Sequence, residues 1–178
     1  MEKYELVEKS HSLLTTELPV FDFDSPPIDP ESHYHAMVEA AIRLGGIGLA
    51  SNQVGLPYRM FVIGDGQTKE SYFPVYNPKI VWYSDETHYL DEGCLTFPGL
   101  FIKIKRPKEI RARLQHYNGK VVTHKFGGMT ARIFQHELMH VNGKFFTDYV
   151  SKLQLEMAIK KAKKKYGCSY SLSEFRVS

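Results

Sequence analysis

Two histidines and a glutamate lie close together in the segment His136-Glu137-Leu138-Met139-His140. On a helix, residues four apart project from the same face, so both imidazoles can bind one metal ion. Glu137 can then act as a general base towards a water molecule beside that ion. The chain has eight histidines, so the probability that this pattern occurs in it by chance is about a few per cent or less. The segment therefore predicts a metal site with a general acid/base next to it.

A catalytic site of this kind needs a third protein ligand and an open position for water. Downstream of His140, the acids Asp148 and Glu156 follow no known ligand pattern. Cys94 lies between Gly93 and a Pro-Gly pair, where the backbone can bend close to an ion. A lone cysteine is more often a small buried apolar residue than a ligand. We nevertheless favour Cys94 as the third ligand.

The glycine-rich segment 46–53, Gly-Ile-Gly-Leu-Ala-Ser-Asn-Gln, is a further candidate. Its two glycines suggest a phosphate loop, but no Gly-Lys-Ser/Thr follows, and dinucleotide binding would require a strand before it and a helix after it. A helix stop followed by a connector explains the glycines as well. The functional alternative is a loop whose backbone amides and Gln53 side chain stabilise a developing oxyanion.

The elements that must position these residues follow from the periodicity of the sequence. Helical spacing predicts helices over residues 31–44, 129–141 and 151–165. Apolar runs and alternation predict strands over 60–63, 73–76, 79–83, 101–105 and 109–116. Asn118-Gly119 is typical of a hairpin turn, after which Val121 begins a return strand. The predicted fold class is α+β, with antiparallel strands packed around a central metal-binding helix, an N-terminal helix and a basic C-terminal helix.

Length and composition predict one domain over residues 1–178, with a core at about 31–150 and a basic helix at about 151–166. The net charge of +3 is too small to indicate a nucleic-acid-binding protein by itself. No secretion or transit signal opens the chain, and no apolar run is long enough to span a membrane. We therefore expect a cytoplasmic protein without a membrane partner.

Three segments, in this order, resemble the motifs of the peptide deformylase family. That family has a Gly-x-Gly-Leu-Ala-Ala-x-Gln loop, a Glu-Gly-Cys-Leu-Ser strand and a Gln-His-Glu-x-Asp-His helix. The corresponding segments here are residues 46–53, Glu92-Gly93-Cys94-Leu95-Thr96 and Gln135-His136-Glu137-Leu138-Met139-His140. The resemblance covers about residues 31–150, and the three motifs together are highly specific.

The resemblance implies removal of the formyl group from the N-terminal methionine of newly made polypeptides, with release of formate. It implies that Cys94, His136 and His140 hold one divalent metal ion. Ferrous iron is the expected metal, and zinc, nickel or cobalt are able to replace it. Glu137 would take a proton from the attacking water and pass it to the leaving amine.

The resemblance also implies which residues surround the reacting group. Gln53 and the backbone amide of Leu95 would stabilise the oxyanion. The expected substrate-binding residues are Ile47, Gly48 and Gly93 for the peptide backbone, and Met129 and Ile133, together with His136, for the methionine side chain.

The sequence departs from the family pattern at a few positions. Ser51 and Thr96 are mild replacements of Ala and Ser. Met139 replaces an acid beside the second histidine, and losing such a partner typically changes affinity or activity about 10–100-fold. We expect Arg106, which that acid would otherwise hold, to have another partner. Phe101 stands where some members carry an Arg near the substrate backbone.

The last predicted helix closes with a run of lysines, Lys160-Lys161-Ala162-Lys163-Lys164-Lys165. A solvated helix face explains them, because cations are favourable near a helix C-terminus. The alternative is that this tail contacts ribosomal RNA and places the enzyme where formylated chains emerge.

The second cysteine, Cys168, and five further histidines receive no predicted role, and none of these histidines has a partner at ligand spacing. We expect these histidines to lie at the surface or in strands: His33, His35, His88, His116 and His124.

Two functions other than deformylation remain open. The first is that of a metallopeptidase, and the role of Cys94 distinguishes it from a deformylase. A metallopeptidase would use the same helix without Cys94. Replacing Cys94 by Ala is expected to abolish metal binding in a deformylase and to leave it intact in such a peptidase, which the metal content of the purified variant would show.

The second alternative is a metal-stabilised binding protein that has lost catalysis. The missing acid at Met139 is its only support, and metal binding without turnover would favour it. Glu137 and Gln53 argue against it, because a purely structural site needs neither.

Overall fold

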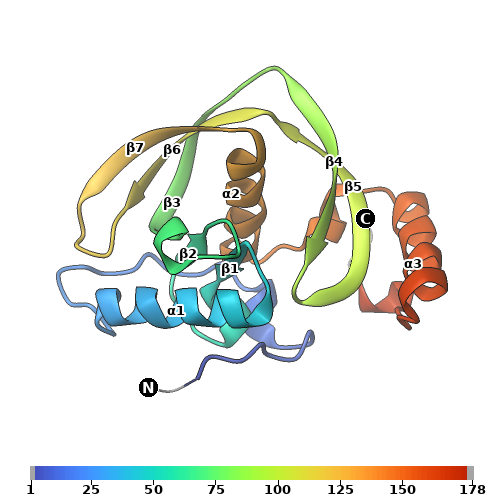
Figure 1. Cartoon of the computed structure of the whole chain (residues 1–178), viewed down its shortest axis with the longest axis horizontal. Helices are drawn as coiled ribbons and strands as arrows, with labels where there is room; N and C mark the ends of the chain where they lie inside the picture. The colour runs from blue at the N-terminus through green and yellow to red at the C-terminus, as the bar shows by residue number, and fades with distance from the viewer. Residues whose placement is uncertain (1–2, 176–178) are drawn as a thin grey trace.

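The computed structural model describes residues 3–175 and combines helices with antiparallel strands (Figure 1). The helices are α1 (Pro30–Leu44), α2 (Gly128–Val141) and α3 (Lys152–Tyr166). The strands are β1 (Gly48–Ala50), β2 (Met60–Ile63), β3 (Phe73–Tyr83), β4 (Thr87–Cys94), β5 (Phe97–Pro107), β6 (Glu109–Gln115) and β7 (Val121–Gly127). This confirms the mixed helix and antiparallel-strand class. Within residues 3–175, no helix is both long enough and apolar enough to cross a bilayer.

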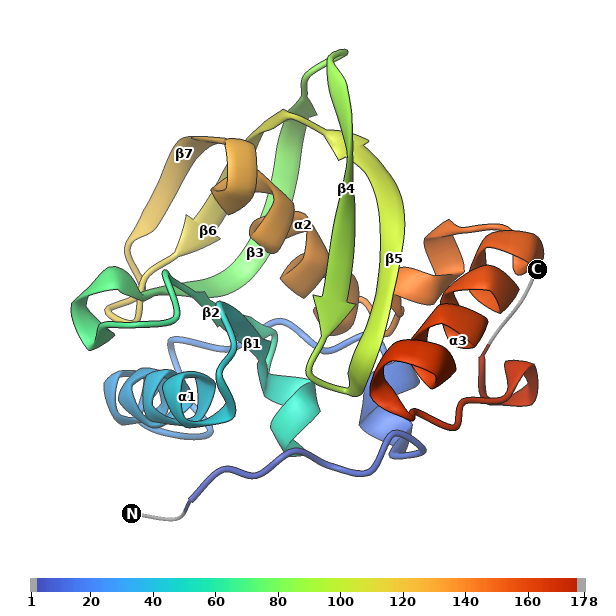
Figure 2. The same cartoon turned by 45° about the vertical axis from the view of Figure 1, so that its right-hand side comes forward.

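The strands form two sheets. Five strands in the order β1-β2-β3-β6-β7 make the larger sheet, and β4 and β5 make a two-stranded arm. Figure 2 shows this arm beside α2, with α3 next to β5. β1 and β4 each pair with a single strand, so each keeps one edge free of strand pairing.

Helix α2 lies in the interior because several elements pack against it. It contacts β1, β2, β5, β6 and β7. On β6, the alternating residues Ile110, Ala112 and Leu114 face inward and pack in one cluster with Ala131 and Phe134 of α2. Ten of the fourteen residues of α2 are buried. The polar groups that the helix carries are therefore taken into the core.

Capping residues explain where the outer helices begin and end. Asp29 accepts a hydrogen bond from the backbone of Ser32 at the start of α1, and Gly45 ends the helix with a φ of 71°. At α3, Ser151 and Gln154 form a reciprocal capping box. The three predicted helices thus agree with the structure to within about two residues at each end.

Two strand predictions needed correction. The predicted strands 73–76 and 79–83 are one strand, β3, interrupted in its pairing at Asn77, which has a φ of 48°. The Asn77 side chain is held by hydrogen bonds with the backbone of Phe21 and with Gln115, which explains this conformation. Most of β4 was not predicted, because it is exposed on both faces over most of its length and lacks apolar alternation.

Residues 3–29 have little regular structure, yet they contribute to the core. Apart from a short 3-10 helix, Ser12–Thr15, the segment is irregular. Leu14, Leu18 and Phe21 are nonetheless buried, and Glu17 bridges to Asn142 just after α2. The segment therefore covers the C-terminal end of α2.

The expectation for His33 was wrong, because this residue is buried on α1 with 1% of its surface exposed. Its two ring nitrogens lie 3.1 Å from the Tyr4 hydroxyl and 3.2 Å from Ser51 Oγ. Burial lowers the pKa of His33 from its ordinary value of 6.5 to about 4. Its position four residues before Met37, on the apolar face of the helix, was the sequence signal that could have indicated this burial.

His35, His88 and His124 are exposed, as expected.

We expect acid to destabilise the protein through His33. Above pH 6.5 the residue is neutral in both states, whereas between 6.5 and about 4 only the unfolded state takes up the proton. This site alone is expected to lower the free energy of unfolding by about 2 kcal/mol between pH 7 and pH 5. Urea unfolding at both values should show a smaller pH dependence for His33→Gln and the parental dependence for exposed His35→Gln. Equal pH dependence in His33→Gln and the parent would contradict the prediction.

Candidate metal centre and active site

The structure brings the three predicted metal ligands together. Cys94 ends β4, while His136 and His140 project from α2. One candidate ligand atom from each residue lies within 4.8 Å of the other two, and Cys94 Sγ is 3.2 Å from His140 Nε2. All three residues are at most 9% exposed. A helix turn and a strand end thus converge on one small buried space.

The chemistry of these donors fits a divalent metal ion. Burial, together with charge on Glu137, raises the pKa of Cys94 to about 12, and burial lowers the pKa of His140. Burial therefore disfavours both the thiolate of Cys94 and the imidazolium of His140 unless a cation is bound beside them. A transition-metal cation stabilises a thiolate and uses neutral imidazole as a ligand. One thiolate and two imidazoles are a donor set suited to iron or zinc.

Glu92 connects the metal donors to two buried arginines. Its carboxylate accepts hydrogen bonds from Arg106 at 2.6 and 2.8 Å and from Arg132 at 2.7 Å. It also lies 3.0 Å from His136 Nδ1. Burial alone raises the pKa of Glu92, but the hydrogen bonds and charges of Arg106 and His136 outweigh it and lower this pKa to about 2. With Nδ1 of His136 donating to a carboxylate, Nε2 is left free to bind a metal.

The position of Arg106 confirms the expectation that it has another partner. Its guanidinium makes the bidentate pair with Glu92, while the sulfur of Met139 lies 3.9 Å from Nη2. The ring of Tyr149 covers the guanidinium at 5.0 Å. Replacing the family's acid by Met139 therefore leaves no unpaired buried charge on Arg106.

Glu137 faces the same space from α2. It is 5% exposed, and within residues 3–175 its Oε2 has no hydrogen-bond partner. Burial, together with the charge of Glu92, raises the pKa of Glu137 to about 8. A Cβ atom placed on Gly48 would lie 2.4 Å from Oε1 of Glu137. The glycine thus allows the backbone of β1 to approach the carboxylate.

Gln53 is oriented by the loop that carries it. Its Oε1 accepts a hydrogen bond from the backbone of Ala50 at 2.9 Å. Its Nε2 then points to Thr96 Oγ1 at 3.1 Å and to Cys94 Sγ at 3.7 Å. The amide therefore presents a donor next to the candidate metal ligands, which is the orientation that oxyanion stabilisation requires.

A cavity of about 500 Å³ opens beside these groups. Every predicted substrate-binding residue lines it, namely Ile47, Gly48, Gly93, Met129 and Ile133, as do the predicted catalytic residues Gln53, Leu95 and Glu137. Cys94 and His136 also line this cavity, whereas His140 is completely buried. The free edges of β1 and β4 contribute Gly48 and Gly93 to its walls.

Several residues that hold the site together were not assigned a role from the sequence. Glu92 belongs to the second motif, and its position two residues before Cys94 was the sequence signal that could have placed it near the metal ligands. Arg132 stands one helical turn before His136, which in principle indicated a shared face. Asn52 donates to the backbone oxygen of His140 at 2.6 Å, and Tyr72 donates to that of Gly46. These last contacts have no sequence signal, because they join distant segments.

Buried thiol and imidazole donors beside a buried carboxylate are the arrangement expected of the metallohydrolase class. The family model for polypeptide deformylase matches residues 4–156. Peptide deformylase of Bartonella henselae is 38% identical over 131 residues, covering 72% of this chain and 74% of that protein. That of Thermotoga petrophila is 38% identical over 133 residues, covering 75% and 77%.

Solved structures agree with this match. The chain is similar to peptide deformylase of Thermotoga maritima, with a TM-score of 0.75 and 31% identity, covering 85% of this chain and 99% of that one. The Legionella pneumophila enzyme has a TM-score of 0.78 and 27% identity, covering 90% and 93%. The chain belongs to the polypeptide deformylase family. It is an enzyme of that family, a hydrolase that removes the N-terminal formyl group.

Glu92→Gln is expected to weaken both the fold and the metal site. It removes the carboxylate that two buried arginines, Arg106 and Arg132, share, so the free energy of unfolding is expected to fall by about 3 kcal/mol. Metal affinity is expected to fall about 10–100-fold, because His136 loses its carboxylate partner. Urea unfolding and chelator competition would measure the two effects.

The matched control is Glu86→Gln, which removes an exposed carboxylate paired with Lys108 at 3.0 Å. Its effect on stability is expected to stay within about 0.5 kcal/mol. Parental metal affinity in Glu92→Gln would show that Glu92 does not position His136.

Proposed function

We propose that Cys94, His136 and His140 hold one divalent metal ion for deformylation and that Glu137 moves the proton. The observation that carries this proposal is the placement of all four side chains in one buried cluster beside a cavity of about 500 Å³. The whole chain, residues 1–178, would act as one catalytic domain arranged around the metal-binding helix α2.

When bound, the metal supplies Lewis-acid chemistry, which polarises the formyl carbonyl and favours deprotonation of water at neutral pH. Ferrous iron is the proposed metal, with zinc, nickel or cobalt as substitutes. A soft thiolate ligand such as Cys94 suits iron or zinc.

Glu137 performs the two proton transfers. It accepts a proton from the attacking water, and it then delivers this proton to the nitrogen of the leaving amine, which releases formate and a free N-terminus. Burial raises the pKa of Glu137 and a cation bound beside it would lower this pKa again, so the carboxylate can both take up and give up a proton near neutral pH. Gly48 keeps the carboxylate in place by allowing close contact with the backbone of β1.

Gln53 and the backbone amide of Leu95 stabilise the oxyanion that forms when water adds to the formyl carbon. The support is the fixed orientation of Gln53, whose Oε1 is held by Ala50 and whose Nε2 faces Cys94. The hydroxyl of Thr96 keeps this amide in position in the absence of substrate.

The substrate is a formyl-methionyl polypeptide bound in extended form between the free edges of β1 and β4. Backbone groups of Ile47, Gly48 and Gly93 would pair with it as a strand would. Met129 and Ile133, with His136, provide a largely apolar wall for the methionine side chain. Such chains are made in the cytoplasm, where we place the enzyme. Docking of the lysine-rich helix α3 on ribosomal RNA stays a prediction.

Release of formate from a formyl-Met-Ala-Ser peptide tests the proposal, with the protein loaded anaerobically with iron or with nickel. The parent is expected to turn over. Glu137→Gln is expected to lower kcat by at least about 100-fold, because general acid–base catalysis is lost. Its metal content, measured by mass spectrometry, is expected to equal that of the parent. Turnover at the parental rate in Glu137→Gln would rule out this general base.

A further inference from the structure

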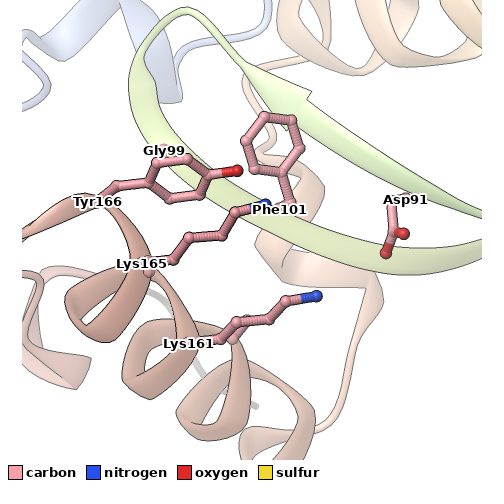
Figure 3. Close-up of a pocket in the computed structure, with 8 residues that line it drawn as sticks. Asp91, Gly99, Phe101, Lys161, Lys165 and Tyr166 are labelled. Atoms are coloured by element: carbon pink, nitrogen blue, oxygen red, sulfur yellow. The ribbon is translucent and has the colours of Figure 1, made fainter.

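A second, smaller cavity lies next to the substrate cavity on the side of α3, and Figure 3 shows the residues that line it. It has a volume of about 220 Å³ and lies between the β4–β5 arm and α3. Asp91, Gly99 and Phe101 line both cavities, so the two are adjacent along the arm. A peptide that leaves the first cavity along β4 would therefore enter the second.

Two lysines form the far wall of this smaller cavity. Lys161 and Lys165 lie one helical turn apart on α3, and Figure 3 shows both side chains extending towards the strand that carries Phe101. The helix is held in this place by Ala158 and Ala162, which pack into the core cluster that includes Leu100 of β5. The lysines are exposed, but the helix that presents them is firmly packed.

The positive charge at this wall is only partly neutralised by the protein. Within residues 3–175, neither Lys161 nor Lys165 forms an ion pair, although Lys165 Nζ lies 5.0 Å from the ring of Tyr166. Like charges four residues apart on a helix repel each other. Asp91 is the one acid lining the cavity, so the lining has a net charge of +1. An anionic group entering here would relieve the repulsion.

Strand geometry indicates which part of the substrate reaches this place. Asp91 precedes Cys94 by three residues on β4, a distance of about 10 Å in a strand. Asp91, Gly93 and Phe101 lie on the same face of the arm, because Gly93 pairs with Phe101 and residues two apart share a face. An extended peptide with its formyl-methionine at Cys94 would bring its third or fourth residue to the level of Asp91.

We propose that Lys161 and Lys165 form a specificity-determining wall of the substrate groove, which favours formyl-methionyl peptides with an acidic side chain at the third or fourth residue. This inference rests on the proposed function. Phe101, packed against Gly93, forms the border over which the peptide passes from the methionine site to the lysine wall. The acidic side chain is held by charge, with the ammonium groups as hydrogen-bond donors.

The test compares three C-terminally amidated peptides, formyl-Met-Ala-Glu-Glu-Ala and its Gln-Gln and Lys-Lys counterparts, with nickel-loaded protein. In low salt, the parent is expected to have a kcat/KM about five-fold higher for the Glu peptide than for the Lys peptide. High salt should remove most of this difference. Fluorescence anisotropy of the labelled, deformylated peptides is expected to show the same order of affinities without turnover.

Charge reversal at the wall supplies the decisive variant. In Lys161→Glu/Lys165→Glu the Glu/Lys ratio is expected to invert. The matched control is Lys160→Glu/Lys164→Glu, which makes the same change of charge at two positions of α3 that are also one turn apart. Lys160 and Lys164 do not line the cavity, so this control should keep the parental ratio. If the reversed variant does not fold by circular dichroism, Lys161→Gln/Lys165→Gln replaces it and is expected to lose the preference.

The outcomes separate this inference from the proposed function. Turnover of the Gln peptide by the parent supports the function whatever the charge preference. Equal kcat/KM for the three peptides, or a ratio that the wall variants leave unchanged, would overturn the lysine wall alone. An equal shift in the Lys160/Lys164 control would also overturn it, because the effect would then be the general charge of the helix.

Discussion

The pairing of one buried carboxylate, Glu92, determines how the site is assembled. Glu92 on β4 meets Arg106 from β5 and Arg132 and His136 from α2, and all four are at most 7% exposed. Leaving any of these groups unpaired in the interior would be costly, so the arm and the helix are constrained to one relative position. In that position Cys94, two residues further along β4, comes within reach of both histidines.

The same constraint explains why Met139 is tolerated where the family has an acid. Arg106 is already neutralised by two hydrogen bonds to Glu92, and Tyr149 and Met139 cover the rest of the guanidinium. Both buried guanidinium groups keep a carboxylate partner, and Arg132 also donates hydrogen bonds to the backbone oxygens of His88 and Ile104. The departure thus changes the surroundings of Arg106 and leaves the groups proposed to react unaltered.

The proposed chemistry and the proposed peptide binding use different features of the fold. The groups proposed to react are buried on α2 and at the end of β4, whereas the proposed groove is built from strand edges and from α3. An edge offers backbone hydrogen bonds to any extended peptide, so it contributes affinity without reading the sequence. In the proposed binding mode, selectivity would then depend on the side chains that line the two cavities, among them Met129, Phe101 and the two lysines of α3.

The sequence by itself determined the helices, most strands of the large sheet and the motif residues, because periodicity, caps and ligand spacing are local properties. Tertiary structure alone decided the rest. Burial of His33, continuity of β3 through Asn77 and the exposed strand β4 depend on distant partners. The pairing of Glu92 with two arginines, and the lysine wall beside the groove, arise where separate elements pack together, and no local pattern records such contacts.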